Sequence, residues 1–349
     1  MAAAAALQVD YLPLAGHEPA RWDGVLGVAT FDGITASSLA ANDIPVADIR
    51  TPVLGSGDEV CEIWRTRQRV ESGQRGGVRY RHGDEVLFGC ISVAESGDPA
   101  HIQGSRSGLH AVTERAYHEI FATLDALAYP HLLRVWNYVP QINVDTHGTE
   151  RYRQFNSARR SAVTACGRDL TGNVPAACAL GSATGSPLVI YFLASREAPT
   201  VVENPRQMSA YNYPPQYGPK PIFSRASVLR EASGAMLFIS GTASIVGHRT
   251  VHAGNAAAQT LETLTNIEAL LGEASRVAGS EFGAPRFDLE TLAYKVYVRN
   301  TEDLPVIQAQ LRAALGSQAQ IMYLRADICR QDLLVEIEAI GRDAANIAA

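Results

Sequence analysis

Long apolar runs are missing from this chain of 349 residues. The longest uninterrupted run covers residues 188–194, which is the length of a strand and far below the roughly 18 residues of a membrane helix. The alanine-rich start at residues 1–7 lacks both a basic segment and a long apolar core, so it does not match a secretory signal. We therefore expect a cytoplasmic protein without a membrane span.

The chain has few cysteines, and their spacing in the sequence shows no paired motif. There are five cysteines, an odd number, and none of them forms a C-x-x-C pair. This spacing argues against a disulfide framework and against a zinc site. Glycine-rich nucleotide loops, H-E-x-x-H and G-x-S-x-G are also absent. We expect acid–base chemistry that needs neither a metal nor another cofactor.

Lysine is almost absent, because only Lys220 and Lys295 stand among the 30 basic residues. The 36 acidic residues outnumber the basic ones and give a net charge of −6, which argues against a nucleic-acid partner. Any anion site must be built mainly from arginine, whose planar fork suits carboxylates. The expected partner is a small molecule.

The expected elements occur twice in the same order. In the C-terminal part we predict strands at 235–240 (ending at Gly241), 292–299, 321–324 and 333–340, and helices at 255–273 and from about residue 301. The stripe of the first helix is formed by Leu261, Leu264, Ile267 and Leu271. In the N-terminal part, strands at 86–91, 132–139 and 188–194 alternate with helices around 116–127 and 150–165. The repeat indicates a diverged duplication.

Two glutamates share one face of the last strand. Glu336 and Glu338 are two residues apart, whereas Leu333, Val335 and Ile337 occupy the opposite face. One interpretation is a solvated outer face. The other is a buried glutamate whose pKa is high enough for it to donate a proton near neutral pH. The pattern leaves both open.

Arginine and tyrosine are concentrated in two further segments. Residues 203–219 combine Arg206 with three tyrosines and several prolines, and residues 150–160 place Tyr152, Phe155 and Arg159 on one helical stripe. Guanidinium and phenol groups on a stiff loop are suited to an anionic ring-shaped ligand. An aromatic packing loop would have the same composition, so this pattern also has two interpretations.

The C-terminal third resembles the Rid/YjgF superfamily. The resemblance lies in residues 238–241 (FISG), 266–271 (NIEALL), 295–298 (KVYV) and 335–340 (VEIEAI), and it covers about residues 222–345. The imine-deaminating members carry a carboxylate-binding arginine at a place that falls near Tyr323 here. The chain lacks that arginine, so an imine deaminase is an alternative that this position does not support.

Over most of residues 130–341 the chain is similar to a narrower family, the two-domain chorismatases. The matching segments are 133–138 (LRVWNY), 150–155 (ERYRQF), 203–207 (ENPRQ), 211–214 (YxYP), 217–219 (YGP), 240–248 (SGTASIVGH) and 329–338 (CRxDLLVEIE). The resemblance implies an α+β fold of two Rid/YjgF-like halves. We expect an N-terminal domain at 1–200, a connecting segment at 201–221 that contributes to the site, and a C-terminal domain at 222–349.

The resemblance also implies an activity, the release of the enolpyruvyl group of chorismate as pyruvate without a cofactor. By family position the acid is Glu336, and Glu338 is its structural neighbour. We expect the substrate to be bound by the arginines and tyrosines of the segments above and by positions near the last strand: Tyr152, Arg159, Arg206, Tyr213, Tyr217, Arg299 and Cys329. Arg159 and Arg206 are predicted to bind its two carboxylates.

The resemblance makes Ala243 and Cys329 the positions that select the product. A thiol is a poor anchor for an attacking water, which favours 3-hydroxybenzoate over 4-hydroxybenzoate and over a dihydroxycyclohexadiene carboxylate. A small-molecule binding protein without catalysis is a further alternative, and either a monomer or a homotrimer fits the sequence.

Overall fold

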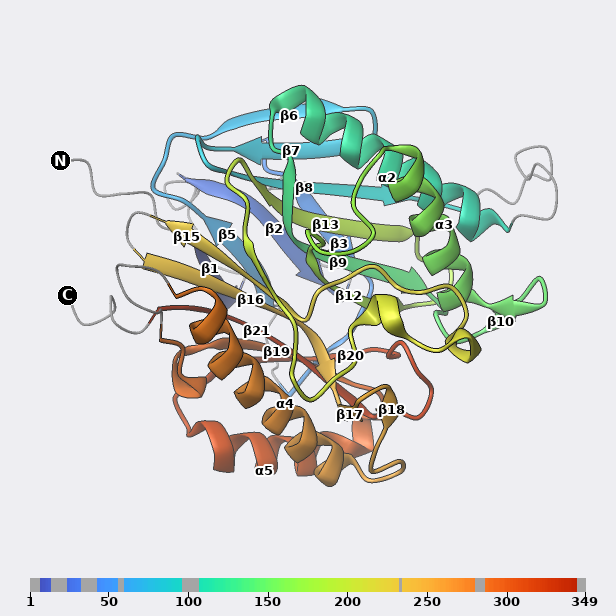
Figure 1. The fold of residues 1–349 in the computed structure, drawn as a ribbon, viewed down its shortest axis with the longest axis vertical. Helices are drawn as coiled ribbons and strands as arrows, with labels where there is room; N and C mark the ends of the chain where they lie inside the picture. Colours follow the sequence, from blue (N-terminus) through green and yellow to red (C-terminus); the bar gives the residue numbers. More distant parts are fainter. Residues whose placement is uncertain are drawn as a thin grey trace.

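The computed structural model describes residues 7–13, 24–32, 43–55, 60–95, 107–231, 234–279 and 286–343. It is an α+β fold with two large sheets, each covered by helices on one side, and a third, smaller sheet (Figure 1). None of the helices in these residues is long and apolar enough to cross a membrane.

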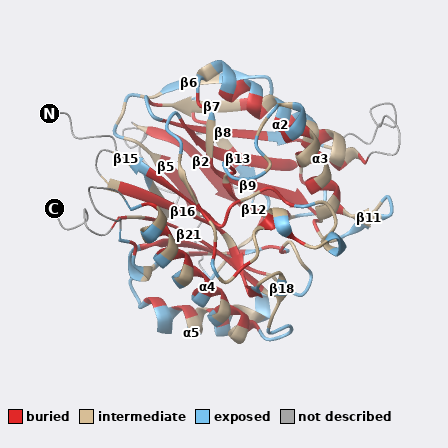
Figure 2. Cartoon of the chain, in the orientation of Figure 1, coloured by how far each residue is buried: buried red, intermediate tan, exposed pale blue. Residues whose placement is uncertain are grey.

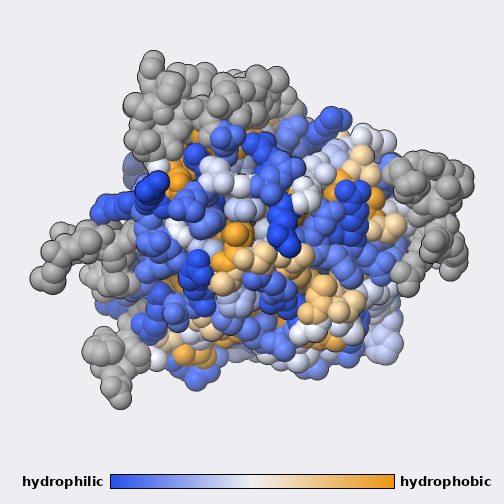
Figure 3. Space-filling view, turned by 90° about the horizontal axis from the view of Figure 1, so that it is seen from above, coloured by the Kyte–Doolittle hydropathy of each residue, from blue (hydrophilic) through white to orange (hydrophobic). Residues whose placement is uncertain are grey.

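The first large sheet has six strands and carries helices α2 (Gly108–Leu127) and α3 (Arg151–Ala165). Its order is β12 (Ala176–Ser182), β9 (His131–Pro140), β13 (Leu188–Ser195), β8 (Val86–Val93), β7 (Val78–His82) and β6 (Glu71–Arg75). Tyr117, Ile120 and Leu124 of α2 are buried toward this sheet. Figure 3 shows the face with β6, β7 and α2, where hydrophilic side chains predominate and hydrophobic ones form small separate groups.

The second large sheet has seven strands and is covered by α4 (Ala256–Val277), which packs beside α5 (Leu304–Leu315). Its order is β14 (Thr200–Val202), β15 (Ala226–Glu231), β16 (Gly234–Ala243), β21 (Val335–Arg342), β19 (Ala293–Val298), β20 (Gln320–Arg325) and β4 (Val53–Leu54). Its first six strands, read from β20 back to β14, reproduce the order and the parallel or antiparallel pairing of the first sheet. The expected pair of similar halves is thus confirmed.

The smaller elements make up the rest of the secondary structure in the described residues. A four-stranded sheet consists of β1 (Gln8–Pro13), β5 (Val60–Arg65), β2 (Val25–Phe31) and β3 (Val46–Ile49). Two short hairpins are β10 (Asp145–Thr146) with β11 (Thr149–Glu150), and β17 (Ile245–Val246) with β18 (Arg249–Thr250). Single 3₁₀ turns are η3 (Ala210–Asn212), η4 (Pro215–Tyr217), η5 (Leu289–Thr291) and η6 (Thr301–Asp303).

The inner faces of the three sheets meet in one core, which Figure 2 shows as buried strands in the middle of the molecule. Trp64 of β5, Trp136 of β9 and Phe238 of β16 touch there, with ring centroids 5.7 and 6.3 Å from Trp64. Because helices cover the outer face of the second sheet, its central strands are buried on both sides. This packing decides the environment of Glu336 and Glu338.

Two local predictions are wrong. Strand β16 does not end at Gly241 but continues to Ala243, with a register shift between Ile239 and Thr242 that absorbs the glycine. Leu261 is 48% exposed, although Leu264, Ile267 and Leu271 are buried as expected. A step of three residues turns a helix by only 300°, so two such steps in succession move Leu261 off the stripe.

Candidate active site

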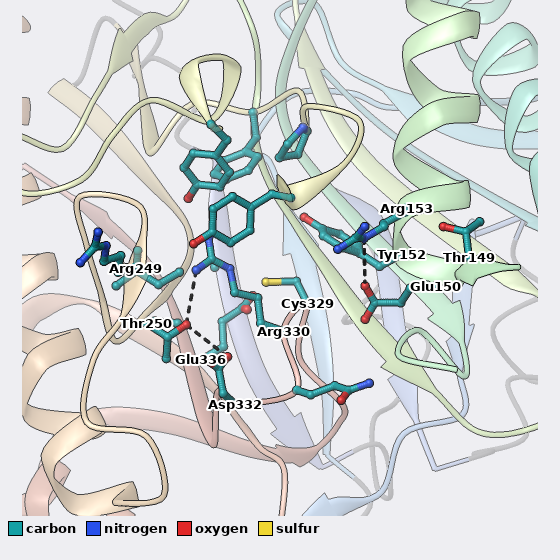
Figure 4. A pocket seen from close by; sticks show the side chains of 18 of the residues that line it. Thr149, Glu150, Tyr152, Arg153, Arg249, Thr250, Cys329, Arg330, Asp332 and Glu336 are labelled. Atoms are coloured by element: carbon teal, nitrogen blue, oxygen red, sulfur yellow. Dashed lines mark hydrogen bonds and ion pairs between the residues drawn. The ribbon is translucent and has the colours of Figure 1, made fainter. Parts of the chain in front are cut away.

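A cavity of about 820 Å³ lies between the second sheet and the start of α3. Its walls come from five places: the β10–β11 hairpin with the first residues of α3, residues 213–225, the end of β16 with the β17–β18 hairpin, the loop 329–332, and Glu336 of β21. Figure 4 shows Tyr152 and Arg153 facing Cys329 and Arg330 across it. Segments that are distant in sequence therefore enclose one space with a carboxyl group in its wall.

The side chain of Glu336 fits into this wall because a glycine, Gly241, lies beside it on the neighbouring strand β16. Its own side chain is only 3% exposed. A Cβ atom at Gly241 would lie 1.9 Å from Glu336 Oε1 and 3.1 Å from Cys178 Cβ. Since a methyl group cannot occupy that position without displacing the carboxyl group, glycine at 241 is what lets Glu336 fold back between β16 and β12.

The surroundings of Glu336 favour its protonated form. Burial, and secondly the negative charge of Glu338, raise the pKa of Glu336 to about 8. The carboxyl group is therefore neutral over most of the physiological range and can donate a proton. Both glutamates are buried, so the solvated outer face that the alternating pattern allowed is wrong.

Glu338 keeps its negative charge because cations and donors surround it. Lys295 Nζ lies 2.8 Å from its Oε1, Arg134 pairs with its Oε2, and Trp136 Nε1 donates to Oε1 at 2.9 Å. Burial alone would raise the pKa of Glu338, but these partners outweigh it and hold the pKa below its usual range. Lys295 also pairs with Glu62 of β5 at 2.5 Å, so all three sheets contribute to this buried network.

Arg330 is a cation of the cavity wall that two tyrosines hold in place. Its guanidinium stacks on Tyr217 and Tyr213, 4.4 and 5.4 Å from the ring centroids. Nη1 donates to the carbonyl oxygen of His248 at 2.9 Å and to Thr250 Oγ1 at 3.3 Å, whereas Nη2 is buried and has no hydrogen-bond partner within the described residues. A pre-positioned guanidinium with a free nitrogen is suited to a carboxylate ligand.

Arg225 is a second cation in the wall, and it is buried, whereas Arg330 is half-buried. Its Nη2 donates to the carbonyl oxygen of Met208 at 2.6 Å and to the Tyr213 hydroxyl at 2.9 Å. Arg225 thereby fixes Tyr213, whose side chain is 6% exposed, at the edge of the cavity. The connecting segment is thus packed into the site.

Six of the nine residues expected from the sequence lie together in the cavity wall: Tyr152, Tyr213, Tyr217, Ala243, Cys329 and Glu336. Burial raises the pKa of the Cys329 thiol to about 12, so this side chain is neutral. It also raises the pKa of Tyr152 well above its usual range.

The structure does not bring the other three residues to this wall. Arg159 lines a different cavity beside α2. Arg206 points to α4 and pairs with Glu262 at 2.6 Å. Arg299 pairs with Asp327 at 2.7 Å and donates to the carbonyl oxygens of residues 328, 330 and 333, which shapes the loop under the cavity.

Arg330 and Arg225 were not among the residues expected from the sequence. Arg330 stands next to Cys329 in a segment that matched the chorismatases, so its position was a signal. Arg225 follows the aromatic segment without a motif of its own, and only the fold brings it to Tyr213.

Comparisons with known proteins agree over nearly the whole chain. The family described as "Chorismatase FkbO/Hyg5-like, N-terminal" matches residues 62–194. A 3-hydroxybenzoate synthase of Streptomyces hygroscopicus is 35% identical over 324 residues, 90% of this chain and 91% of the relative. A chorismatase of the same organism is 39% identical over 80% of this chain and 78% of its own length.

A solved structure agrees as well. The crystal structure of a chorismatase superposes with a TM-score of 0.83 at 32% sequence identity, covering 97% of this chain and 99% of the other. The similarity therefore extends over both halves of the fold.

Proposed function

The chain belongs to the chorismatase family, and on this premise we propose that it converts chorismate into pyruvate and 3-hydroxybenzoate in the 820 Å³ cavity. The observation that carries the proposal is the buried Glu336, which is neutral below about pH 8 and faces the cavity. Incubation of the enzyme with chorismate, with pyruvate measured through lactate dehydrogenase, tests it. Absence of pyruvate would reject a chorismatase and favour a deaminase or a binding protein.

The first step is protonation of an enol ether. The enolpyruvyl group of chorismate ends in a methylene carbon. A proton from Glu336 adds to this carbon and converts the group into an oxocarbenium ion next to a carboxylate. A carboxylic acid with a raised pKa suits this role, since it is protonated at working pH and leaves an anion beside the developing cation. Burial is the main reason why Glu336 keeps its proton, and the negative charge of Glu338, which stays ionised, adds to this effect.

The carboxylates of chorismate need cations, and we assign them to arginines of the wall. Arg330 offers its free Nη2, and Arg225 offers Nε, which is buried and unpaired within the described residues. Tyr213 and Tyr217 hold these guanidinium groups in place by stacking and by a hydrogen bond. This assignment replaces Arg159 and Arg206, which the structure places elsewhere.

Substitution of Arg330 by lysine is expected to lower kcat/KM by about 10- to 100-fold, because lysine keeps the charge but loses the fork and the stacking. Arg249, on the exposed rim of the same cavity, is the matched control, and Arg249→Lys should change kcat/KM less than about threefold. Equal effects of the two substitutions would contradict the role of Arg330. Steady-state pyruvate release measures both.

The identity of the product depends on whether the ring hydroxyl or a water molecule attacks after protonation. In the route that we propose, the ring hydroxyl passes its proton to the Glu336 carboxylate and its oxygen attacks the neighbouring ring carbon. The bond from that carbon to the ether oxygen breaks, and pyruvate leaves with the ether oxygen. The resulting epoxide opens and loses a ring proton, which restores aromaticity. Atoms balance without water, since chorismate equals 3-hydroxybenzoate plus pyruvate. The neutral thiol of Cys329 offers a weak anchor for a competing water.

In ¹⁸O-labelled water, pyruvate trapped at once as lactate is expected to stay unlabelled, and the second product to be 3-hydroxybenzoate. Attack of water on the oxocarbenium carbon would instead put the label into lactate and leave a dihydroxycyclohexadiene carboxylate. Mass spectrometry of both products decides between these routes. Labelled lactate with the dihydrodiol as sole product would contradict the proposed route.

A further inference from the structure

A second cavity, of about 230 Å³, lies between α2 and α3 at the edge of the first sheet. Most of its wall is apolar or aromatic, from Tyr117, Phe121, Leu124, Leu132, Val163 and Ile222. Its polar groups are Arg159, Arg168, His131, Asn173 and Asp169. No residue lines both this cavity and the active-site cavity among those that the structure describes.

Arg159 is the unusual member of this wall. It is 4% exposed, its guanidinium lies 5.0 Å from the ring centroid of Tyr117, and its Nε is buried without a hydrogen-bond partner. Within the described residues it forms no ion pair. By contrast, the buried Arg134 and Arg151 pair with Glu338 and Glu95. A buried guanidinium without a carboxylate is costly unless an anion binds it.

A short wall separates the two cavities. Pro221 and Phe223 line the active-site cavity, and Ile222 between them lines the second one. Helix α3 likewise presents Tyr152 to the first cavity and Arg159, two turns later, to the second. A ligand in the second cavity would therefore touch the helix and the strip that also shape the active site.

We propose that the second cavity binds a small aromatic monocarboxylate, with its carboxylate on Arg159 and its ring against Phe121, Leu124 and Val163. This inference goes beyond the reaction proposed above and does not depend on it. The volume lies below the range of about 300–1,000 Å³ for larger ligands, which suits a single ring.

The charges of the wall select one carboxylate rather than two. Arg168 already pairs with Asp125 and donates to the carbonyl oxygen of Pro130, so Arg159 is the guanidinium left for a ligand. Asp169 adds a negative charge at the rim, which repels a second carboxylate. A dianion such as chorismate is therefore disfavoured here.

Equilibrium dialysis with radiolabelled benzoate tests the proposal on the full chain carrying Glu336→Gln, which is used so that added chorismate stays intact. Benzoate is expected to bind with and without saturating chorismate. Val163→Phe, which fills the second cavity, and Arg159→Gln, which removes its cation, should each weaken benzoate binding at least about tenfold. Arg168→Gln is the matched control and should weaken it less than about threefold, because Arg168 is already paired.

Three results would overturn the proposal: no benzoate binding at millimolar concentration, full displacement by chorismate, or unchanged binding in both Val163→Phe and Arg159→Gln. If Val163→Phe does not fold, thermal unfolding of the parent protein and of Arg159→Gln provides the test instead. Arg159→Gln removes an unpaired buried charge and should fold, and benzoate should raise the Tm of the parent protein but not of this variant. Failure of the wild type to release pyruvate would concern the proposed function alone.

Discussion

Replacing Glu336 with glutamine is expected to lower kcat for pyruvate release at least about 100-fold, the low end of the effect of a general acid. Glutamine keeps the size and polarity of the side chain but has no proton to give to the methylene carbon. KM should change little, since the carboxylates of the substrate are assigned to Arg330 and Arg225. Steady-state kinetics near pH 7, where Glu336 is protonated, measures the loss.

Stability separates this effect from misfolding. The pKa of Glu336 is raised in the folded protein, so between its ordinary value and about 8 the folded state holds a proton that the unfolded state has released. The free energy of unfolding of the wild type therefore falls as pH rises through this range. Glu336→Gln lacks that penalty and should be at least as stable as the wild type at pH 8. An inactive variant that is less stable there would contradict the account.

Replacing Glu338 with glutamine is expected to lower the free energy of unfolding by about 3–5 kcal/mol, because it removes the carboxylate that faces Lys295 and Arg134 in a fully buried network. Urea unfolding measures this cost. Glu302→Gln, at an exposed position, is the control and should change the free energy by less than about 0.5 kcal/mol.

A Glu338→Gln protein as stable as the Glu302→Gln control would contradict the buried network. Glu338→Gln is expected to lower kcat much less than Glu336→Gln, because burial is the main cause of the raised pKa of Glu336 and the charge of Glu338 only the second. The comparison of unfolding and activity thus distinguishes a positioning residue from the acid itself.

Much of the fold could be predicted from periodicity. The strand and helix order of both halves follows from apolar stripes and alternation. The structure adds that Asn255 caps α4, because its side chain accepts a hydrogen bond from the Ala258 backbone N–H. The strands before residue 80 were not predicted from local pattern. Their role appears only in three dimensions, where Glu62 of β5 reaches Lys295.

The environment of Glu336 and Glu338 could not be predicted from their own strand. Alternation places both on one face, but whether that face meets water depends on the first and third sheets, which pack against it. Gly241 gave the opposite signal, because a glycine at the end of an apolar run usually marks a turn. Here its missing Cβ makes room for the acid within a continuous strand.

The arginines show the same limit. Composition indicated that guanidinium groups would bind the anion, yet it could not say which ones. Arg206 stands in a matching segment but turns to Glu262 on α4, whereas Arg330 reaches the cavity because Tyr213 and Tyr217 fold over it. Which arginine reaches the cavity depends on contacts between side chains that are distant in the sequence.

The pH dependence of kcat/KM for pyruvate release tests the central claim, that Glu336 acts as a protonated acid, most directly. The carboxylates of chorismate remain ionised across the range from pH 6 to 10, so the enzyme dominates the profile. We predict a level rate at low pH and a fall above about pH 8, as Glu336 loses its proton. A rate that rises through pH 8 would show that the ionised carboxylate is the active form and would contradict the account.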